Sequence, residues 1–407
     1  MALVVASGCT TAPPPPAVCS APQGAPADAL ALATSDAAFA VALFQPAVAA
    51  AGAGKNVLVS PYSVSATLTM VDVGAAGATD SQIQSVLRLP GSGTAVAPAY
   101  AALACQDETD GTADGDQLSI ANSIWGQKGM AFQPSFLSTL STGYDAPLQQ
   151  VDFGSDPDGA ASTINAWVSA QTHDQIADLL QPGNLDSLTR LVLVNAVYFK
   201  GAWATAFDAS ATAPQPFTLG DGTSVSIPTM HSATVSLRSG SAQGASIHEL
   251  SYKGNGLAMD FIVPDGSLPA LEASLTPASL SATVSSLQGA ATVELYLPKF
   301  SFRTASTLVP ILEGMGIVDL FDAKKANLSG MDGAMDLYVK TVIQDAIVEV
   351  DETGTVAAAA TEATSEATSA VAVPPTVRID HPFLFLIRDT TNGSILFMGQ
   401  VQDPRQG

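Results

Sequence analysis

A nearly continuous apolar stretch, TRLVLVNAVYFKGAW, runs from Thr189 to Trp203. Side chains of a strand alternate between the two faces of a sheet, so a strand that is apolar at nearly every position is covered on both faces. This stretch therefore predicts a central strand with packed layers above and below it. At 407 residues, the chain is long enough to bury a core of that size.

The pattern before this stretch is mainly helical, and the pattern after it is mainly extended. Apolar residues between positions 30 and 44 recur with helical spacing and predict an amphipathic helix packed on the body, not a membrane span, because Asp36 and Pro46 interrupt the region. From Phe217 onward we predict strands and turns, with one helix near TLVPILEGMGI. The sequence therefore predicts an α+β architecture with antiparallel or mixed sheets, forming a single domain over residues 29–407.

The first residues, MALVVASGCTTAPPPPAVCSAP, contain an apolar run that ends in small residues before Cys9, followed by a proline-rich tether. ASGC resembles the lipobox of bacterial lipoproteins, in which the cysteine is acylated. This resemblance makes residues 1–28 an export and lipid-anchoring segment and places the protein outside the cell or in the cell envelope. A mis-assigned start or a simple tail is the alternative. Cys19 and Cys105 then remain as a disulfide pair or as two free thiols.

The charge of the chain excludes one class of partner. There are 37 acidic and 15 basic residues, which give a formal net charge of -22. Such a chain repels phosphate backbones and anionic lipid surfaces, so no nucleic acid partner is expected.

Signatures of catalysis and metal binding are missing from the sequence. It contains no G-x-S-x-G, no H-E-x-x-H, no P-loop and no dinucleotide-binding glycine motif after a strand. The four histidines are scattered, and the neighbours His248 and Glu249 would point to opposite faces of a strand. DGTADGD, residues 110–116, lacks the terminal glutamate of a calcium loop and is expected to be a solvated loop. We therefore expect no metal and no cofactor.

A run of small residues, GTVAAAATEATSEATSAVAVPP, occupies residues 354–375 between two stretches typical of buried strands. If the run forms a strand, its odd positions from Thr355 to Ala367 are all small and uncharged, while Glu362 and Glu366 both fall on even positions. One face can then enter a packed interior while the other stays in water. A low-complexity linker and an alanine-rich helix are the alternative interpretations.

Five segments resemble signature segments of the serpins and occur in the order found in that family. They are NVLVSPYSVSATLTMVDVGAAGAT, LVLVNAVYFKGAW, ELSYKGNGLAMDFIVPDG, LPKFSF and DHPFLFLIRDTTNGSILFMGQVQDP. The resemblance covers about Leu30 to Pro404. It implies the serpin fold, with three β-sheets, about eight or nine helices and an exposed reactive loop at about residues 353–376.

The resemblance implies an inhibitor of serine proteases and not an enzyme. In the family mechanism, a protease forms an acyl-enzyme with the loop, and the freed hinge inserts as a new strand of the largest sheet, an established example of strand addition. The stretch EVDETGTVAAAATEA resembles the hinge of inhibitory members. The hinge residues implied are Glu352, Gly354, Thr355, Val356, Ala357, Ala358, Ala359 and Ala360.

The resemblance also implies a region where the sheet opens. Its members are Ser60, Pro61, Ser63, Asn195, Trp203, Lys299 and Gln344. Gln344 replaces a histidine that is common in the family, and glutamine does not titrate, so pH-dependent opening through this position is not expected. Glu352 is expected to pair with Lys299 and hold the uninserted state.

The cleaved bond is expected at Thr368–Ser369 when counted from Glu352. Counting back from HPFLF places it near Val371–Ala372, with Ala370 as a further candidate. These side chains are small or β-branched and uncharged, which suits an elastase-like or subtilisin-like pocket. The first basic residue after the hinge, Arg378, lies too close to the next strand for trypsin to be an expected target.

The expected partner is a serine protease, held covalently by a monomeric inhibitor. No glycosaminoglycan partner is expected, because SQIQSVLRLPGSGTAVAPAYAALA contains Arg88 as its only base. One alternative is a non-inhibitory serpin-like protein whose loop is only a protease substrate. The other is an enzyme with an unrecognised site.

Overall fold

The computed structural model of the chain describes residues 26–111, 117–254, 256–352 and 373–406. Its α-helices are α1 (Pro26–Ala51), α2 (Pro61–Asp72), α3 (Gly77–Leu87), α4 (Gly93–Gly111), α5 (Pro134–Gly143), α6 (Pro157–Gln171), α7 (Leu268–Ser274), α8 (Pro277–Ser285), α9 (Val309–Met315) and α10 (Ser329–Asp332). Its strands are β1 (Val57–Val59), β2 (Gln117–Gln127), β3 (Gln149–Val151), β4 (Leu191–Lys200), β5 (Ala213–Thr218), β6 (Ser224–Ala242), β7 (Ala245–Ser251), β8 (Leu257–Pro264), β9 (Ala291–Pro298), β10 (Phe300–Thr307), β11 (Val339–Val350), β12 (Thr376–Arg378), β13 (Phe383–Asp389) and β14 (Ile395–Val401).

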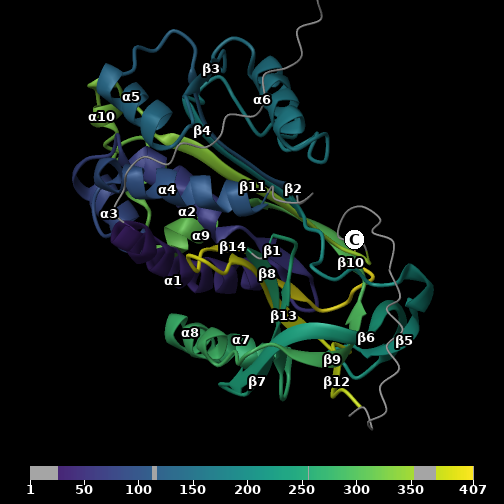
Figure 1. Ribbon diagram of the computed structural model, residues 1–407. Coiled ribbons are helices and arrows are strands. Elements are labelled where there is room, and N and C mark those ends of the chain that lie inside the picture. Colours follow the sequence, from purple (N-terminus) through teal and green to yellow (C-terminus); the bar gives the residue numbers. More distant parts are fainter. Residues whose placement is uncertain (1–25, 112–116, 255, 353–372, 407) are drawn as a thin grey trace, which may run out of the picture.

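The strands form three sheets, two of which share β6. One sheet has the order β10-β11-β4-β2-β3 and crosses the upper part of the molecule in Figure 1. The second runs β1-β14-β13-β8-β7 and reaches β6 through residues 238–242. The third joins β5, β9 and β12 to the earlier part of β6. The predicted α+β class and three sheets are confirmed.

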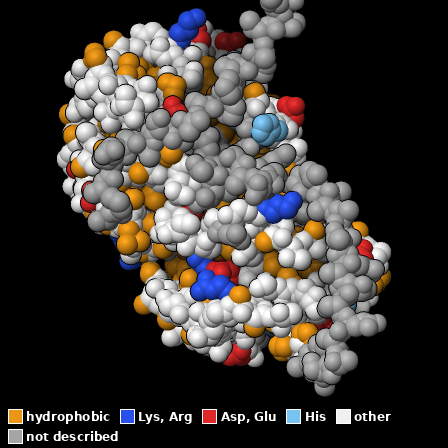
Figure 2. Space-filling model, viewed as in Figure 1, with side chains coloured by type: hydrophobic (Ala, Val, Ile, Leu, Met, Phe, Trp, Pro, Cys, Tyr) orange, Lys and Arg blue, Asp and Glu red, His pale blue; other side chains and the backbone are white. Residues whose placement is uncertain are grey.

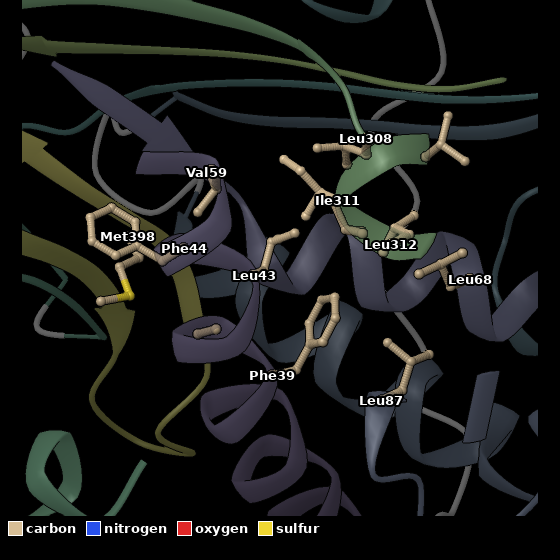
Figure 3. Packing of buried hydrophobic residues seen from close by; sticks show 14 of the residues in the cluster. Phe39, Leu43, Phe44, Val59, Leu68, Leu87, Leu308, Ile311, Leu312 and Met398 are labelled. Carbon is tan, nitrogen blue, oxygen red and sulfur yellow. The ribbon is translucent and has the colours of Figure 1, made fainter. Parts of the chain in front are cut away.

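The apolar stretch around β4 is the central strand that the sequence predicts. β4 has neighbours on both sides, and every residue of it from Leu191 to Phe199 is buried. Leu193 packs into the core beneath the sheet, which is shown in Figure 3 around Phe39, Leu68 and Leu312. Val194 packs on the opposite face, in the cluster that contains Ile164 of α6. Both faces of the strand are therefore covered.

Helix α1 packs on the body through its apolar stripe. Leu32, Phe39, Leu43 and Phe44 are buried, whereas Leu30 in the first turns is exposed. Within the described ranges, α1 is the one helix long and apolar enough to cross a membrane by length and composition, and half of that stretch is buried inside the fold. Its contacts with α2, α4 and β14 are those of a core helix.

The prediction of a single helix after Phe217 was wrong. α7, α8 and α10 also lie in that part of the chain, and the described residues contain ten α-helices, close to the eight or nine that the family resemblance implies. α8 is fixed by a capping box, in which Thr276 accepts a hydrogen bond from the backbone of Ser279 and the Ser279 side chain accepts from the backbone of Thr276. Short helices of Ala, Ser and Leu show little apolar periodicity, so their caps are the stronger signal.

The surface is poor in charge. Figure 2 shows few lysine, arginine and acidic side chains on a face made mostly of other polar and apolar groups. This agrees with a charged fraction of 13% over the whole chain.

Candidate functional site

The candidate site is the seam between β4 and β11 in the five-stranded sheet. The two strands are parallel and directly hydrogen-bonded, with Val342 opposite Leu193 and Val348 opposite Phe199. Their outer neighbours, β2 and β10, are antiparallel to them. A segment that leaves β11 and turns back beside it would run antiparallel to both β11 and β4. The seam can therefore accept such a strand only by opening.

A row of three amides, two buried and one half-buried, crosses this seam on the face toward α2. Gln344 of β11 lies opposite Asn195 of β4, and Asn195 lies opposite Asn122 of β2. Gln344 holds the start of α2 with two hydrogen bonds: its Oε1 accepts from the Ser60 backbone N at 3.1 Å, and its Nε2 donates to the Ser60 backbone O at 3.0 Å. Strand β11 is therefore tied to α2 by two hydrogen bonds between uncharged groups, the Gln344 amide and the Ser60 backbone.

Ser60 and Pro61 form the helix start that the sequence predicts. Ser60 is the N-cap residue of α2 and accepts from the backbone N of Ser63, while its Oγ donates to the Leu396 backbone O at 2.7 Å. Pro61 occupies the first turn, where its missing N–H costs nothing. Ser63 in turn donates through Oγ to Asn122 Oδ1.

Asn195 is only half satisfied. Its Nδ2 donates to Thr67 Oγ1 at 2.6 Å, but its buried Oδ1 has no hydrogen-bond partner. A buried acceptor without a partner costs about 1 to 3 kcal/mol. The closed seam therefore leaves a polar atom uncompensated at its centre.

The upper end of the seam is closed by contacts with the last described residues after β11. Trp203 Nε1 donates to the Asp351 backbone O at 2.8 Å, and the indole stacks on Tyr252 with ring centroids 4.5 Å apart. Lys299 Nζ lies 2.6 Å from Glu352 Oε2, which confirms the predicted pair. Thr212 Oγ1 donates to the other carboxylate oxygen at 2.7 Å.

Two opposing effects act on the Glu352 carboxyl. Burial alone would raise its pKa, but the hydrogen bonds from Lys299 and Thr212, with the charge of Lys299, lower the pKa below its usual value of 4.5. A lowered carboxyl pKa means that the folded state binds its proton less readily than the unfolded chain. The pair thus stabilises the closed state at neutral pH, and this stabilisation is lost as the pH falls below about 4.5.

We expect Lys299→Met to lower the free energy of unfolding of the uncleaved protein by about 1 to 3 kcal/mol at neutral pH, because it leaves a largely buried carboxylate without its cation. Thermal unfolding of both proteins at neutral pH and at about pH 3.5 measures this, and the difference should shrink at the lower pH. Lys324→Met, at an exposed position, is the matched control. An equal effect of both substitutions would contradict the assigned role.

Several residues of the site were not predicted. Asn122, Thr67 and Thr212 each bond a predicted residue from another element. Asn122 did carry a signal, because it shares strand parity with Leu118 and Ile124, both buried. A polar side chain on the apolar face of a strand is expected to be buried and therefore to have a hydrogen-bond partner.

Other predictions fall outside the described residues. These are the hinge from Gly354 to Ala360, the cleavage candidates from Thr368 to Ala372, and Cys9. Cys105 in α4 is disulfide-bonded, whereas Cys19 lies outside the described ranges. The predicted loop at 110–116 is in part wrong, because Asp110 and Gly111 belong to α4.

The remaining polar candidates have structural partners. His248 Nδ1 lies 2.9 Å from Ser239 Oγ, while Glu249 on the other face is buried between Arg238 and Arg388. Arg378 lies within β12, with its guanidinium 3.6 Å from the centre of the Tyr296 ring. Among the described residues, no group of three or more His, Cys, Asp or Glu side chains could hold a metal ion.

The chain is similar in sequence and fold to known proteins. A family model described as Serpin (serine protease inhibitor) matches residues 34–404. The leukocyte elastase inhibitor of Bos taurus is 36% identical over 92% of this chain and 99% of its own length. An uncharacterized serpin-like protein of Methanosarcina acetivorans is 32% identical over 86% of this chain and 82% of its own length. The crystal structure of native protease nexin-1 with heparin has a TM-score of 0.81 and 30% identity, and it covers 92% of this chain and all of that one.

A three-sheet fold with a closed seam before a long connecting segment defines a protein of the serpin class. The chain belongs to the serpin family. Proteins of this family are named as protease inhibitors and not as enzymes, so the absence of catalytic signatures in the sequence is accounted for.

Proposed function

We propose that this protein inhibits serine proteases by trapping the acyl-enzyme, and that residues 354–367 then enter the seam between β4 and β11. The observation that carries the proposal is the direct parallel pairing of β4 with β11 ahead of a segment with one small, uncharged face. The incoming strand would exchange one parallel ladder for two antiparallel ones, which are more stable per residue.

The contacts around the seam support a state held ready to open. Side chains bridge the seam mainly at its upper end, where Lys200 Nζ of β4 lies 3.1 Å from Glu349 Oε2 of β11 and Trp203 Nε1 donates to the Asp351 backbone O. In the middle of the seam, Gln344 ties β11 to Ser60 of α2, and Asn195, with its unpartnered Oδ1, lies directly opposite Gln344. Opening therefore breaks side-chain contacts mainly at the upper end, and it exposes an acceptor that has no partner in the closed state.

We further propose elastase-like or subtilisin-like proteases as targets, cleaving at Thr368–Ser369 or within the next three bonds. All candidate side chains are small or β-branched, and the leukocyte elastase inhibitor of Bos taurus is a relative over nearly the whole chain. Arg378 is held in β12 against Tyr296, which makes it a poor site for trypsin.

Incubation with pancreatic elastase is expected to give a protease adduct that survives denaturing electrophoresis, and trypsin is expected to give none at Arg378. Mass spectrometry of the adduct assigns the acylated residue, since one peptide bond is cut and the protease serine becomes esterified. If elastase yields only cleaved chain, the protein is a substrate, as in the non-inhibitory alternative. Elastase whose active-site serine is already blocked is the control.

The remaining parts of the proposal rest on the sequence. We propose a bacterial, exported protein anchored through lipidated Cys9, acting as a monomer in the cell envelope or outside the cell. Nucleic acid and glycosaminoglycan partners are not proposed, because the net charge is -22 and the helix region after Ser81 contains one base.

A further inference from the structure

Helix α2 packs against the seam and holds strands on both sides of it. On one side, the backbone of Ser60 at the start of the helix makes its two hydrogen bonds to Gln344 of β11. On the other side, Thr67 Oγ1 accepts from Asn195 Nδ2 of β4 at 2.6 Å. Strands β4 and β11 can therefore separate only if one of these contacts breaks or if α2 moves.

The same helix has a second polar face, which points toward α1 and α4. Two positions along a helix rotate a side chain by about 200°, so Ser65 lies nearly opposite Thr67. Ser65 Oγ donates to Asp36 Oδ1 of α1 at 2.5 Å and is also hydrogen-bonded to the Tyr100 hydroxyl of α4. Helices α1, α2 and α4 pack together here (Figure 1), and every residue of α2 is buried. A change at Asp36 therefore acts directly on the helix that holds the seam.

Asp36 is a fully buried carboxyl group without a counter-ion. Its Oδ1 accepts from Ser65 and, at 3.2 Å, from the Tyr100 hydroxyl, while its Oδ2 has no hydrogen-bond partner. In the described part of the chain, no lysine, arginine or histidine forms an ion pair with it. A charge on this carboxyl would be compensated by neither water nor a cation, so its ionisation is unfavourable while the site stays dry.

The titratable groups around Asp36 supply no positive charge. On α4, burial raises the pKa of Tyr100 well above 10, so its hydroxyl stays neutral. Burial, together with the charges of Asp389 and Asp36, also raises the pKa of Asp107 on α4. Arg388, next to Asp389, is already paired with two other carboxylates. The other described neighbours of α1, among them β1 and β14, present no charged group to Asp36.

We propose that Asp36 is a pH-sensitive element that sets how readily the seam between β4 and β11 opens. The neutral carboxyl leaves α2 packed against the seam. The carboxylate loosens the contact between α1 and α2, because its charge is relieved only when water reaches it. Gln344 cannot titrate, so the pH dependence enters from the opposite side of α2. The benefit of this control rests on the inhibitory function proposed above, since opening is what admits residues 354–367.

The direction of the pH dependence follows from the burial of Asp36. Burial raises the pKa of this carboxyl in the closed state from 3.8 to about 7. In an open state where water reaches it, the carboxyl loses its proton near 3.8, so between these two values the open state binds fewer protons than the closed state. Raising the pH from about 4 to about 7 therefore favours opening, and at higher pH the effect levels off.

Hydrogen–deuterium exchange of the intact chain measures this opening directly. Protection factors of the β4 and β11 amides, corrected for the intrinsic pH dependence of exchange, are compared at about pH 6 and about pH 8. Full hydration of Asp36 in the open state would increase opening by about tenfold between these two pH values. We expect the protection of β4 and β11 to fall by about threefold to tenfold, and that of β8 in the second sheet to change less.

Asp36→Asn is the matched test, because the amide keeps the shape of the neutral acid and cannot ionise. The carboxyls of Asp72 and Glu272 also have a pKa of about 7, so the difference between variant and parent is what isolates Asp36. In the variant, the protection of β4 and β11 should be equal at both pH values to within about twofold. Asp28→Asn removes an exposed carboxyl from the same helix and should behave as the parent does.

Three outcomes would overturn the proposal. They are equal protection of β4 and β11 at both pH values in the parent, an equal fall in the parent and in Asp36→Asn, or a fall of the same size in β8, which would mean that the whole fold loosens. The first and third need only the parent, so they hold even where the variant does not fold. No protease is present, so a missing elastase adduct beside the expected exchange pattern would count against the inhibitory function alone.

Discussion

A single cut at the proposed reactive bond is expected to raise the melting temperature of the protein by roughly 10 to 20 °C. About 14 residues would enter the seam between β4 and β11, and at roughly 0.5 to 1 kcal/mol net per hydrogen bond they contribute on the order of 10 kcal/mol. Dividing this free energy by an unfolding entropy of about 2.1 cal/mol/K per residue gives the stated shift in melting temperature. Calorimetry of intact and cut protein measures it.

The same insertion explains how an inhibitor could disable a protease. At about 3.3 Å per residue, the strand would carry the acylated enzyme roughly 45 Å. The control is intact protein incubated with elastase whose active-site serine is blocked. Its melting temperature should remain that of the intact protein. If the cut and intact proteins unfold together, no energy is stored in the closed seam, and the trapping mechanism fails.

The parts of the fold that could be predicted were those encoded in one continuous stretch. The run from Leu191 to Phe199 is apolar on both parities, so a central strand was the consistent solution, and the structure buries it on both faces. The start of α2 could also be predicted from neighbouring residues alone, because Ser60 is a favoured N-cap residue and Pro61 is favoured in the first turn.

The short helices could have been predicted only from their ends. α7 begins after Ser267 with a proline in its first turn, and α8 begins with a capping box at Thr276. Neither has a long apolar stripe, so periodicity favoured strands and turns. Cap chemistry was the better evidence here.

The site was predicted where the family resemblance gave a residue its partner, as for Glu352 and Lys299. Partners supplied by another element were not predicted. Thr212 lies 140 positions from Glu352, and Thr67 lies 128 positions from Asn195.

Thr355→Arg is expected to abolish the covalent elastase complex while cleavage continues. Insertion would place odd-numbered hinge side chains on the face of the sheet where Phe199 and Val348 pack in the core. Burying an unpaired guanidinium there costs several kcal/mol, so insertion becomes slower. Hydrolysis of the acyl-enzyme then occurs before the protease is trapped. Each 1.4 kcal/mol added to the insertion barrier costs about a tenfold loss in trapping relative to hydrolysis.

The neighbouring substitution Val356→Arg should retain the complex, because even positions would lie on the outer face beside Lys200 and Glu349. Those side chains are 26% and 30% exposed, so an added arginine stays in water and can reach Glu349. The ratio of adduct to cleaved chain, read from denaturing gels at equal elastase, compares the two variants. If both lose the adduct equally, the parity of the hinge has no role; if both retain it, the hinge does not enter the seam between β4 and β11.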